Sequence, residues 1–330
     1  MALALVRYIL CDDRGPEEAC GKCPNCQKTE RYVHPDWHFS YPTIGTNATS
    51  ELFLTQWRDA LAQSPYLSVN QWLQRVGSEN QQGNITKEEC VQIVRKLSLK
   101  SFEGGVKVLT MWMPEYLGKE GNRLLKMIEE PPDQTIFILV AENQELILNT
   151  ILSRCQTIAF PPLSDEVVQQ GLTGQLGIEP ERAQAIAQLA NGNYCEALSL
   201  SGEMESDHAL RFLEWLRQCY RGNGAALTPW VEEFARLGRE SQKNFFRYGL
   251  HFLREFLAMK LGGARLTRLR PAELETARKL AGVLSYEQIE PMVDLFNDCI
   301  YYIERNANQK VLLLDSSIRL HRFMKPGPIE

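Results

Sequence analysis

Residues 106–140 read VKVLTMWMPEYLGKEGNRLLKMIEEPPDQTIFILV, and this stretch decides the fold that we expect. Its two ends, 106–111 and 135–140, are short apolar runs of the kind found in strands buried on both faces of a parallel sheet. Between them, residues 119–129 have apolar side chains at helical spacing, and the double proline that follows ends the helix. A third apolar run, at 156–160, predicts a third short strand. Alternating strands and helices predict an α/β fold with a parallel sheet and right-handed crossovers.

The regions on either side of these strands divide the chain into three expected domains. The sheet, with an irregular and aromatic-rich insertion at about 34–84, lies in a module over residues 1–161. The aromatic residues of the insertion suit either a small satellite core or a docking surface. After this module the apolar patterns have helical spacing, which predicts a small helical domain over 162–204 and a larger all-helical domain over 205–330.

Composition and charge exclude several classes of protein. The chain has 330 residues, of which 44% are hydrophobic, and it contains no apolar stretch near the roughly 20 residues that a membrane span needs. Its formal net charge of -5 disfavours a protein that holds nucleic acid through its overall field. Four of the nine cysteines crowd into residues 11–26 and the others are scattered, which does not indicate a disulfide framework. We therefore expect a cytoplasmic protein without a membrane segment.

The crowded cysteines have the spacing Cys11-x8-Cys20-x2-Cys23-x2-Cys26. Four thiolates fill a tetrahedral shell around zinc and leave no position for a water molecule, so the site is expected to be structural rather than catalytic. Gly21 permits a tight turn between ligands, which lets backbone amides point at sulfur. An iron–sulfur cluster also takes four cysteines, and free or redox-active thiols are the remaining alternative.

Three stretches, taken in order, resemble one family. They are Cys20-Gly-Lys-Cys-Pro-Asn-Cys26, Asn122-Arg-Leu-Leu-Lys-Met-Ile-Glu-Glu-Pro-Pro132 and Ile151-Leu-Ser-Arg-Cys155. Over about residues 1–200, the chain resembles the AAA+ subunits of the bacterial DNA polymerase III clamp loader. The resemblance implies a RecA-like AAA+ domain with a zinc knuckle, a helical lid domain and an all-α collar domain for oligomerisation.

The family contains motor subunits that hydrolyse ATP and a delta-prime subunit that generally does not, and the departures of this sequence favour the second type. Trp112 and Met113 stand where a motor subunit has the acidic residues that hold magnesium and orient water. Glu115 is the nearest acid after them. Cys195 takes the place of the sensor arginine in the lid domain. The sequence contains no Gly-x4-Gly-Lys-Ser/Thr, and both the loss of this loop and a late start of the chain stay open.

Arg154, in Ser153-Arg154-Cys155, is retained. In the family this arginine reaches toward the γ-phosphate of ATP held by a neighbouring subunit, where a planar cation neutralises charge on the transferred phosphoryl group. The resemblance implies a delta-prime stator in a heteropentamer with tau/gamma motor subunits and a delta subunit, with Arg154 as an arginine finger in trans. It also implies that the chain binds no ATP productively, and that it meets the sliding clamp and primer–template DNA mainly through the complex.

Two other functions fit parts of the sequence. One is an ATP-hydrolysing motor subunit of the tau/gamma type, against which Trp112 and Met113 count. The other is a free-standing zinc module that binds nucleic acid, although the cysteine segment has few basic residues. Separately, residues 236–270 hold nine Lys or Arg against two Glu, with phenylalanines interleaved, so direct contact of this stretch with DNA phosphates is a further hypothesis.

Overall fold

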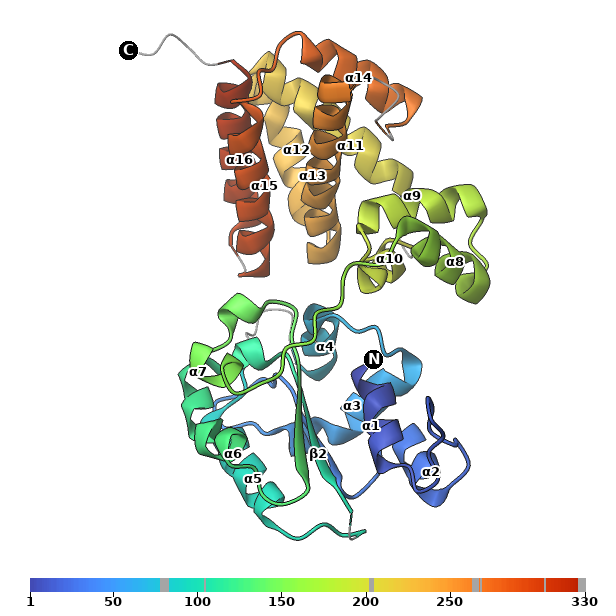
Figure 1. The fold of residues 1–330 in the computed structure, drawn as a ribbon. Helices are drawn as coiled ribbons and strands as arrows, with labels where there is room; N and C mark the ends of the chain where they lie inside the picture. Colours follow the sequence, from blue (N-terminus) through green and yellow to red (C-terminus); the bar gives the residue numbers. More distant parts are fainter. Residues whose placement is uncertain are drawn as a thin grey trace. The chain divides into compact units, whose positions relative to one another are not determined.

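The computed structural model describes residues 1–77, 83–103, 105–201, 205–262, 267, 269–305 and 307–325. The chain forms two compact units, Met1–Phe160 and Pro161–Glu330, and each has its own hydrophobic cores (Figure 1). No helix within the described ranges is both long enough and apolar enough to cross a membrane.

The first unit is built around a parallel sheet of three strands, in the order β1 (Trp37–Ser40), β2 (Lys107–Trp112) and β3 (Thr135–Val140). The strands predicted at 106–111 and 135–140 are confirmed to within a residue. The first five residues of β2, the central strand, are all buried, which is expected of an apolar run with helices on both faces. The α/β fold with a parallel sheet is therefore confirmed.

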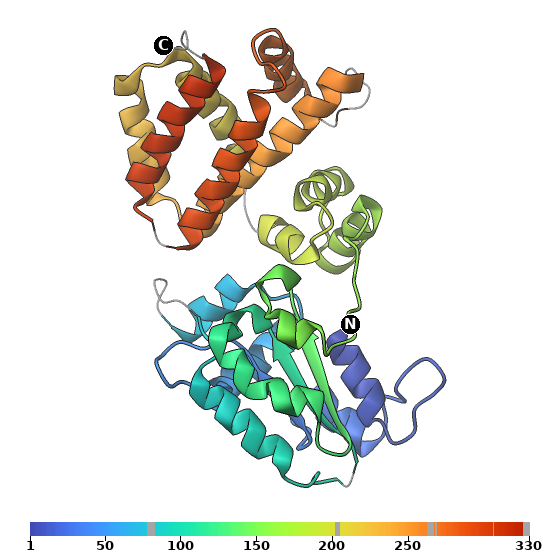
Figure 2. The ribbon, with the colours of Figure 1, turned by 60° about the vertical axis from the view of Figure 1, so that its left-hand side comes forward.

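Helices cover both faces of this sheet (Figures 1 and 2). Successive residues of β2 point to opposite faces, so Val108 joins the core that includes α1 (Ala2–Leu10), whereas Leu109 joins the core that includes α5 (Lys87–Ser98). The remaining helical segments of this unit are α2 (Pro24–Glu30), η1 (Ser50–Phe53), α3 (Leu54–Gln63), α4 (Val69–Val76), η2 (Pro114–Leu124), α6 (Leu125–Glu129), η3 (Gln144–Leu146) and α7 (Asn149–Leu152).

Two local predictions differ from the structure. The helix expected over 119–129 lies in the 3₁₀ helix η2 up to Leu124 and is α-helical only in α6. Gly118, with φ 50° and ψ −140°, breaks the helical backbone directly before it. The strand expected at 156–160 was wrong, since no residue of this run is assigned to a strand. A strand needs backbone partners, and among the described residues β3 pairs only with β2. Ile158 and Phe160 are consequently 65% and 63% exposed.

Most aromatic residues of the insertion form a satellite core on β1 and β2. Tyr41 stacks on Trp57 with 4.2 Å between ring centroids, and Trp72 lies edge-on to both at 5.0 Å. Trp112, the last residue of β2, packs on Trp57 at 5.2 Å. Trp57 and Trp72 are almost fully buried, while Tyr66 stays exposed. Of the two roles considered for these aromatic residues, the core is the one that the packing favours.

Trp72→Ala is expected to destabilise the first unit by about 3–5 kcal/mol, because the side chain is fully buried and its Nε1 donates to the Pro42 carbonyl at 2.7 Å. Urea denaturation followed by tryptophan fluorescence measures the change. Leu52→Ala, at an exposed position of the same insertion, is the control and should change the free energy of unfolding by less than about 0.5 kcal/mol. A loss below about 1 kcal/mol for Trp72→Ala would contradict the packing described for this core.

The second unit is helical throughout its described elements, as predicted. Its first three helices, α8 (Asp165–Leu176), α9 (Pro180–Ala190) and α10 (Tyr194–Ser201), share one core, and the later helices share another. The boundaries 162–204 and 205–330 stay a prediction, which the two separate cores support. The later helices are α11 (Glu205–Arg221), α12 (Gly224–Arg236), α13 (Arg239–Gly262), α14 (Pro271–Ala281), α15 (Ile289–Glu304) and α16 (Gln309–Met324).

The basic stretch 236–270 is largely engaged inside this unit. Its four phenylalanines, Phe245, Phe246, Phe252 and Phe256, are buried core residues. Arg247 forms an ion pair with Glu196 at 2.8 Å, and Arg254 donates to the Asn191 side chain at 2.9 Å. These contacts leave less of the stretch available to DNA phosphates than the sequence indicated. Outside the described residues lie Arg265 and Arg268.

Candidate functional site

The four clustered cysteines come together at the junction of α1 and α2. Cys11 follows the last residue of α1, and Cys23 caps the start of α2. The four sulfur atoms all lie within 4.8 Å of one another. Cys11 Sγ is 3.9 Å from Cys23 Sγ, and Cys20 Sγ is 3.9 Å from Cys26 Sγ. A tetrahedral site with zinc–sulfur bonds of about 2.3 Å places its sulfur atoms about 3.8 Å apart. The cluster therefore has the geometry to bind a metal ion such as zinc.

Backbone amides point at these sulfur atoms. Cys20 Sγ accepts from the N–H groups of Lys22 at 3.4 Å and Cys23 at 3.3 Å, and the Cys26 N–H donates to Cys23 Sγ at 3.3 Å. Gly21, with φ +71°, makes the tight turn that this arrangement requires. The hydrogen bonds lower the pKa of Cys20 to about 7, whereas burial raises the pKa of Cys26 to about 12. Amides that stabilise thiolate charge are the surroundings that a metal-binding thiol needs.

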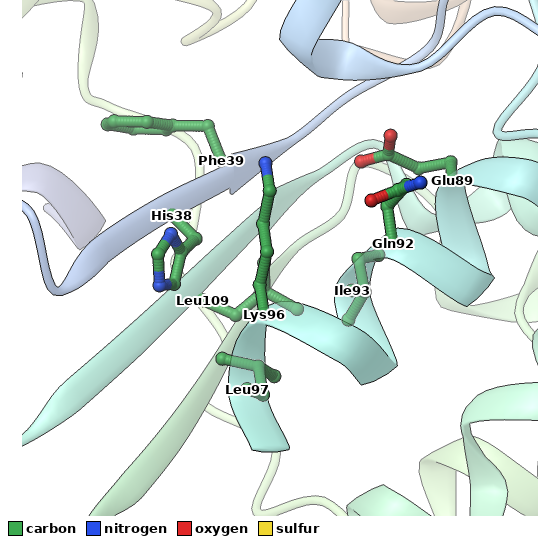
Figure 3. A pocket seen from close by; sticks show the side chains of 8 residues that line it. All are labelled: His38, Phe39, Glu89, Gln92, Ile93, Lys96, Leu97 and Leu109. Atoms are coloured by element: carbon green, nitrogen blue, oxygen red, sulfur yellow. The ribbon is translucent and has the colours of Figure 1, made fainter. Parts of the chain in front are cut away.

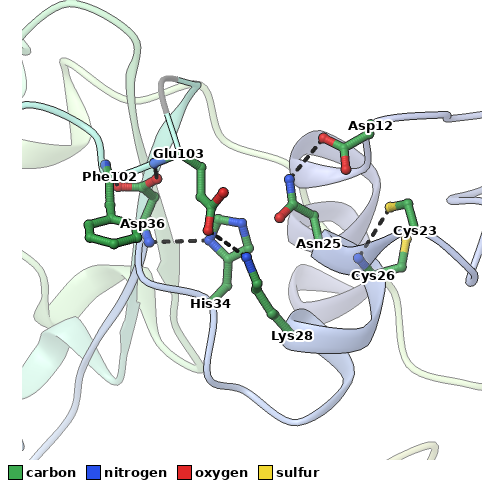
Figure 4. A network of polar contacts seen from close by, with 9 residues as sticks. All are labelled: Asp12, Cys23, Asn25, Cys26, Lys28, His34, Asp36, Phe102 and Glu103. Carbon is green, nitrogen blue, oxygen red and sulfur yellow. Dashed lines mark hydrogen bonds and ion pairs between the residues drawn. The ribbon is translucent and has the colours of Figure 1, made fainter.

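Polar contacts tie the knuckle, defined here as residues 11–30, and the segment that leads from it to β1, to the loop before β2 (Figure 4). Lys28 on α2 forms an ion pair with Glu103 at 2.5 Å. The buried Asp36 carboxylate accepts from the N–H groups of residues 102 and 103 at 2.6 and 2.9 Å. The knuckle itself holds five acidic and three basic residues, which does not favour a free-standing module that binds nucleic acid.

Apolar side chains occupy the two positions, 112 and 113, at which the resemblance to motor subunits would place catalytic acids. Trp112 packs on Trp57, and Met113 is 4% exposed with φ 58° and ψ 58°. A thioether or an indole cannot bind a hard cation or accept a proton. Glu115 Oε1 accepts from the N–H groups of residues 142 and 143 at 2.6 and 2.8 Å. The acid nearest to these positions in the sequence thus serves to fix the loop that follows β3.

Cys195 stands where the resemblance to motor subunits would place the sensor arginine. Cys195 is half-buried in the first turn of α10. The next residue, Glu196, is paired with Arg247 of α13. A thiol cannot present a cationic fork to a phosphate, as an arginine at this position would.

Arg154 lies just after the single turn of α7. Its Nη1 donates to the Thr150 carbonyl at 2.6 Å and to Ser153 Oγ at 3.3 Å, and its Nη2 forms an ion pair with Glu129, the last residue of α6. The Arg154 side chain keeps 31% of its surface exposed. Cys155, which follows it, is half-buried. The guanidinium is therefore held in place while part of it stays open to solvent.

The structure brings the four cysteines together and places Arg154 in a separate environment of the same unit. The sequence analysis did not predict the ion pair between Glu129 and Arg154, although Glu129 stands inside the Asn122–Pro132 motif. The sequence did offer one signal: Glu129 and Arg154 have opposite charges and stand in the two motifs that resemble the same family. No sequence pattern predicted that Glu115 accepts hydrogen bonds from the backbone after β3.

A small hollow between α5 and the first two strands has room for about one water molecule (Figure 3). Burial lowers the pKa of His38, so its imidazole is neutral at pH 7. Glu89 accepts from the Ser50 N–H at 2.8 Å, and Lys96 is paired with Glu51. The charged groups of the hollow are thus engaged with the chain itself. Its lining consists of His38, Phe39, Glu89, Gln92, Ile93, Lys96, Leu97 and Leu109.

Comparison with known proteins places the chain among replication proteins. The profile of a family described as "DNA polymerase III, delta subunit" matches residues 1–164. DNA polymerase III subunit delta' of Escherichia coli K12 is 23% identical over 334 residues, which cover 99% of this chain and 86% of that protein. DNA polymerase III subunit delta' of Bacillus subtilis 168 is 27% identical over 201 residues, which cover 61% of this chain and 49% of that protein. The alignment thus spans about half the length of the second relative.

A solved structure, that of a DNA polymerase III gamma subunit-related protein from Thermotoga maritima, covers 90% of this chain at 16% identity, with a TM-score of 0.35. The class defined by the family profile and the sequence relatives is the subunits of the DNA polymerase III clamp loader. Within that class, this chain belongs to the delta' subunit family.

Proposed function

We propose that this chain acts as the stator of a DNA polymerase III clamp loader: it hydrolyses no ATP itself and supplies Arg154 as an arginine finger to a neighbouring subunit. The observation that carries the proposal is the contrast between the carboxyl end of β2 and the residues that follow α7. Trp112 and Met113 occupy the positions of the catalytic acids and join the packed interior. Arg154, by contrast, stays partly exposed.

The absence of hydrolysis follows from what ATP cleavage requires. Magnesium must be held by carboxylate oxygens, and a base must orient the attacking water. Trp112 and Met113 provide neither, and Glu115 is held through its Oε1 by two backbone N–H groups, while its Oε2 is buried. The proposed stator therefore binds no ATP productively.

Arg154 has the chemistry that a finger needs. A guanidinium is planar and always charged, and it stabilises the negative charge that develops on a phosphoryl group during transfer. Because Arg154 is partly exposed at the end of a short helix, it is available to a phosphate held by another subunit. The finger is proposed to act in trans for that reason.

The metal in the knuckle is proposed to be structural zinc, held by Cys11, Cys20, Cys23 and Cys26. When bound, zinc would cross-link the end of α1 to the start of α2. Four sulfur ligands close the coordination shell, which suits a structural rather than a catalytic ion. An iron–sulfur cluster is the competing occupant, and metal analysis separates the two.

The proposed partners are tau/gamma motor subunits and a delta subunit in a heteropentamer in the cytoplasm, with the sliding clamp and primer–template DNA met mainly through that assembly. Support comes from the similarity to DNA polymerase III subunit tau of Escherichia coli K12, which is 24% identical over 73% of this chain. The engaged side chains of the 236–270 stretch favour DNA contact through the complex rather than through this chain alone.

The isolated chain is expected to show no magnesium-dependent ATP hydrolysis above background, because it lacks the carboxylates that would hold the metal. Phosphate release, with a motor subunit as the positive control, measures this. When the chain is added to motor and delta subunits, hydrolysis stimulated by clamp and primed DNA should rise. A turnover of the isolated chain that Glu115→Gln abolishes would contradict the proposal, as would an assembly whose hydrolysis does not respond to the chain.

A further inference from the structure

We propose that Glu129 is a positioning residue for Arg154, an inference that rests on the proposed role of Arg154 as a finger. Two segments that are separate in the sequence meet at this contact. Glu129 ends α6, directly before the residues that lead into the double proline, and Arg154 follows α7. Their side chains form an ion pair. Nothing in the proposed stator function alone requires a carboxylate at this place.

The backbone beneath Arg154 is fixed by packing. Ile147 and Ile151 are buried with Leu117 of η2 in one core. Gly121 of η2 lies so close that a Cβ there would be 3.1 Å from Ile151 Cδ1. The short helix α7 therefore rests directly on η2, and its position does not depend on Glu129.

A fixed backbone alone does not hold the guanidinium in one orientation, because an arginine side chain has many rotamers and α7 is only four residues long. Additional contacts of the side chain are needed to order it. The Thr150 carbonyl and Ser153 Oγ hold Nη1 at 2.6 and 3.3 Å. Both of these acceptors are local to the arginine and constrain one end of its planar fork. Glu129 holds Nη2, so it is the contact from another segment that sets the direction of the fork. Ordering the side chain in advance removes part of the entropy cost of engaging a phosphate.

The carboxylate leaves a face of the guanidinium available. Among the described residues, no acceptor lies within hydrogen-bonding distance of Arg154 Nε. A phosphate oxygen of a nucleotide on the neighbouring subunit can approach there while Glu129 keeps its contact with Nη2. Glu129 keeps 45% of its side chain exposed, so the pair contributes little to folding and Glu129→Gln is expected to fold normally.

In a loader reconstituted with motor and delta subunits, Glu129→Gln is expected to lower kcat for ATP hydrolysis by roughly threefold to tenfold and to leave KM unchanged. Glu130→Gln is the matched control, because Glu130 is the adjacent, exposed glutamate of the same motif, and it should behave as the unchanged protein does. In an Arg154→Ala background, Glu129→Gln should cause no further loss, since the residue acts through the arginine.

A direct readout uses the isolated full-length chain with labelled arginine. NMR should show restricted rotation of the Arg154 guanidinium, which Glu129→Gln releases and Glu130→Gln does not. The inference is overturned if Glu129→Gln raises kcat, which would make Glu129 a competitor of the phosphate, or if it lowers kcat equally without Arg154. Unchanged hydrolysis after Arg154→Ala would instead overturn the proposed finger, and the NMR result would still decide whether Glu129 orders the side chain.

Discussion

Arg154→Ala is expected to slow ATP hydrolysis at the adjacent site of the assembled clamp loader by about a hundredfold or more, while the isolated chain unfolds at an unchanged temperature. Arginine fingers in related phosphoryl transfers contribute about 10³–10⁵ to the rate, because they neutralise charge only as it develops. Arg154 makes surface contacts alone, so its loss removes little packing. Since a loader has several ATP sites, single-turnover kinetics with quantified burst amplitude measures the effect at one of them.

Two variants sharpen the Arg154 experiment. Arg154→Lys keeps the charge but loses the planar fork, so it should restore only a small part of the rate. Arg123→Ala removes an exposed arginine of η2 that is paired with Glu120, and it should leave hydrolysis unchanged. A normal burst from loaders that contain Arg154→Ala would refute the finger.

The purified chain is expected to contain one zinc ion, and Cys26→Ser should lower its affinity for zinc by at least about a hundredfold. Loss of the metal should unfold the knuckle locally, because few other contacts hold its exposed segment 12–18 in place. The remainder of the first unit should persist, since its cores lie around the sheet. Metal analysis and limited proteolysis measure both effects. Cys155→Ser is the matched control, and it should keep the zinc.

The zinc affinity is also expected to fall with pH. Burial raises the pKa of Cys26 to about 12, so in the metal-free protein this thiol keeps its proton at pH 7 and must release it when zinc binds. Each proton released makes the affinity drop about tenfold per pH unit as the pH is lowered. Cys20, whose pKa is about 7, adds a second proton below neutral pH. A flat dependence between pH 6 and 8, or iron in the purified protein, would contradict the assignment.

The sequence predicted those parts of the fold that local patterns determine. The runs at 106–111 and 135–140 have the composition of buried strands, and both are strands in the structure. The run at 156–160 has a similar composition, but strand formation depends on a neighbouring backbone, which a local pattern does not contain. The same distinction applies to the sites. Spacing predicted the cysteine cluster, whereas the Glu129–Arg154 pair depends on how α6 and α7 pack.

The aromatic packing at the end of β2 also bears on how such a subunit evolves. A carboxylate placed at Met113 would sit in a position that is 4% exposed, and one placed at Trp112 would remove a ring that packs on Trp57. Burying an unpaired charge there would cost several kcal/mol, a large part of the stability of an ordinary domain. Mutations that introduced the acids one at a time would therefore destabilise the first unit. For the proposed stator, single substitutions toward the acids of a motor subunit would thus lower the stability of the fold before they could supply any activity.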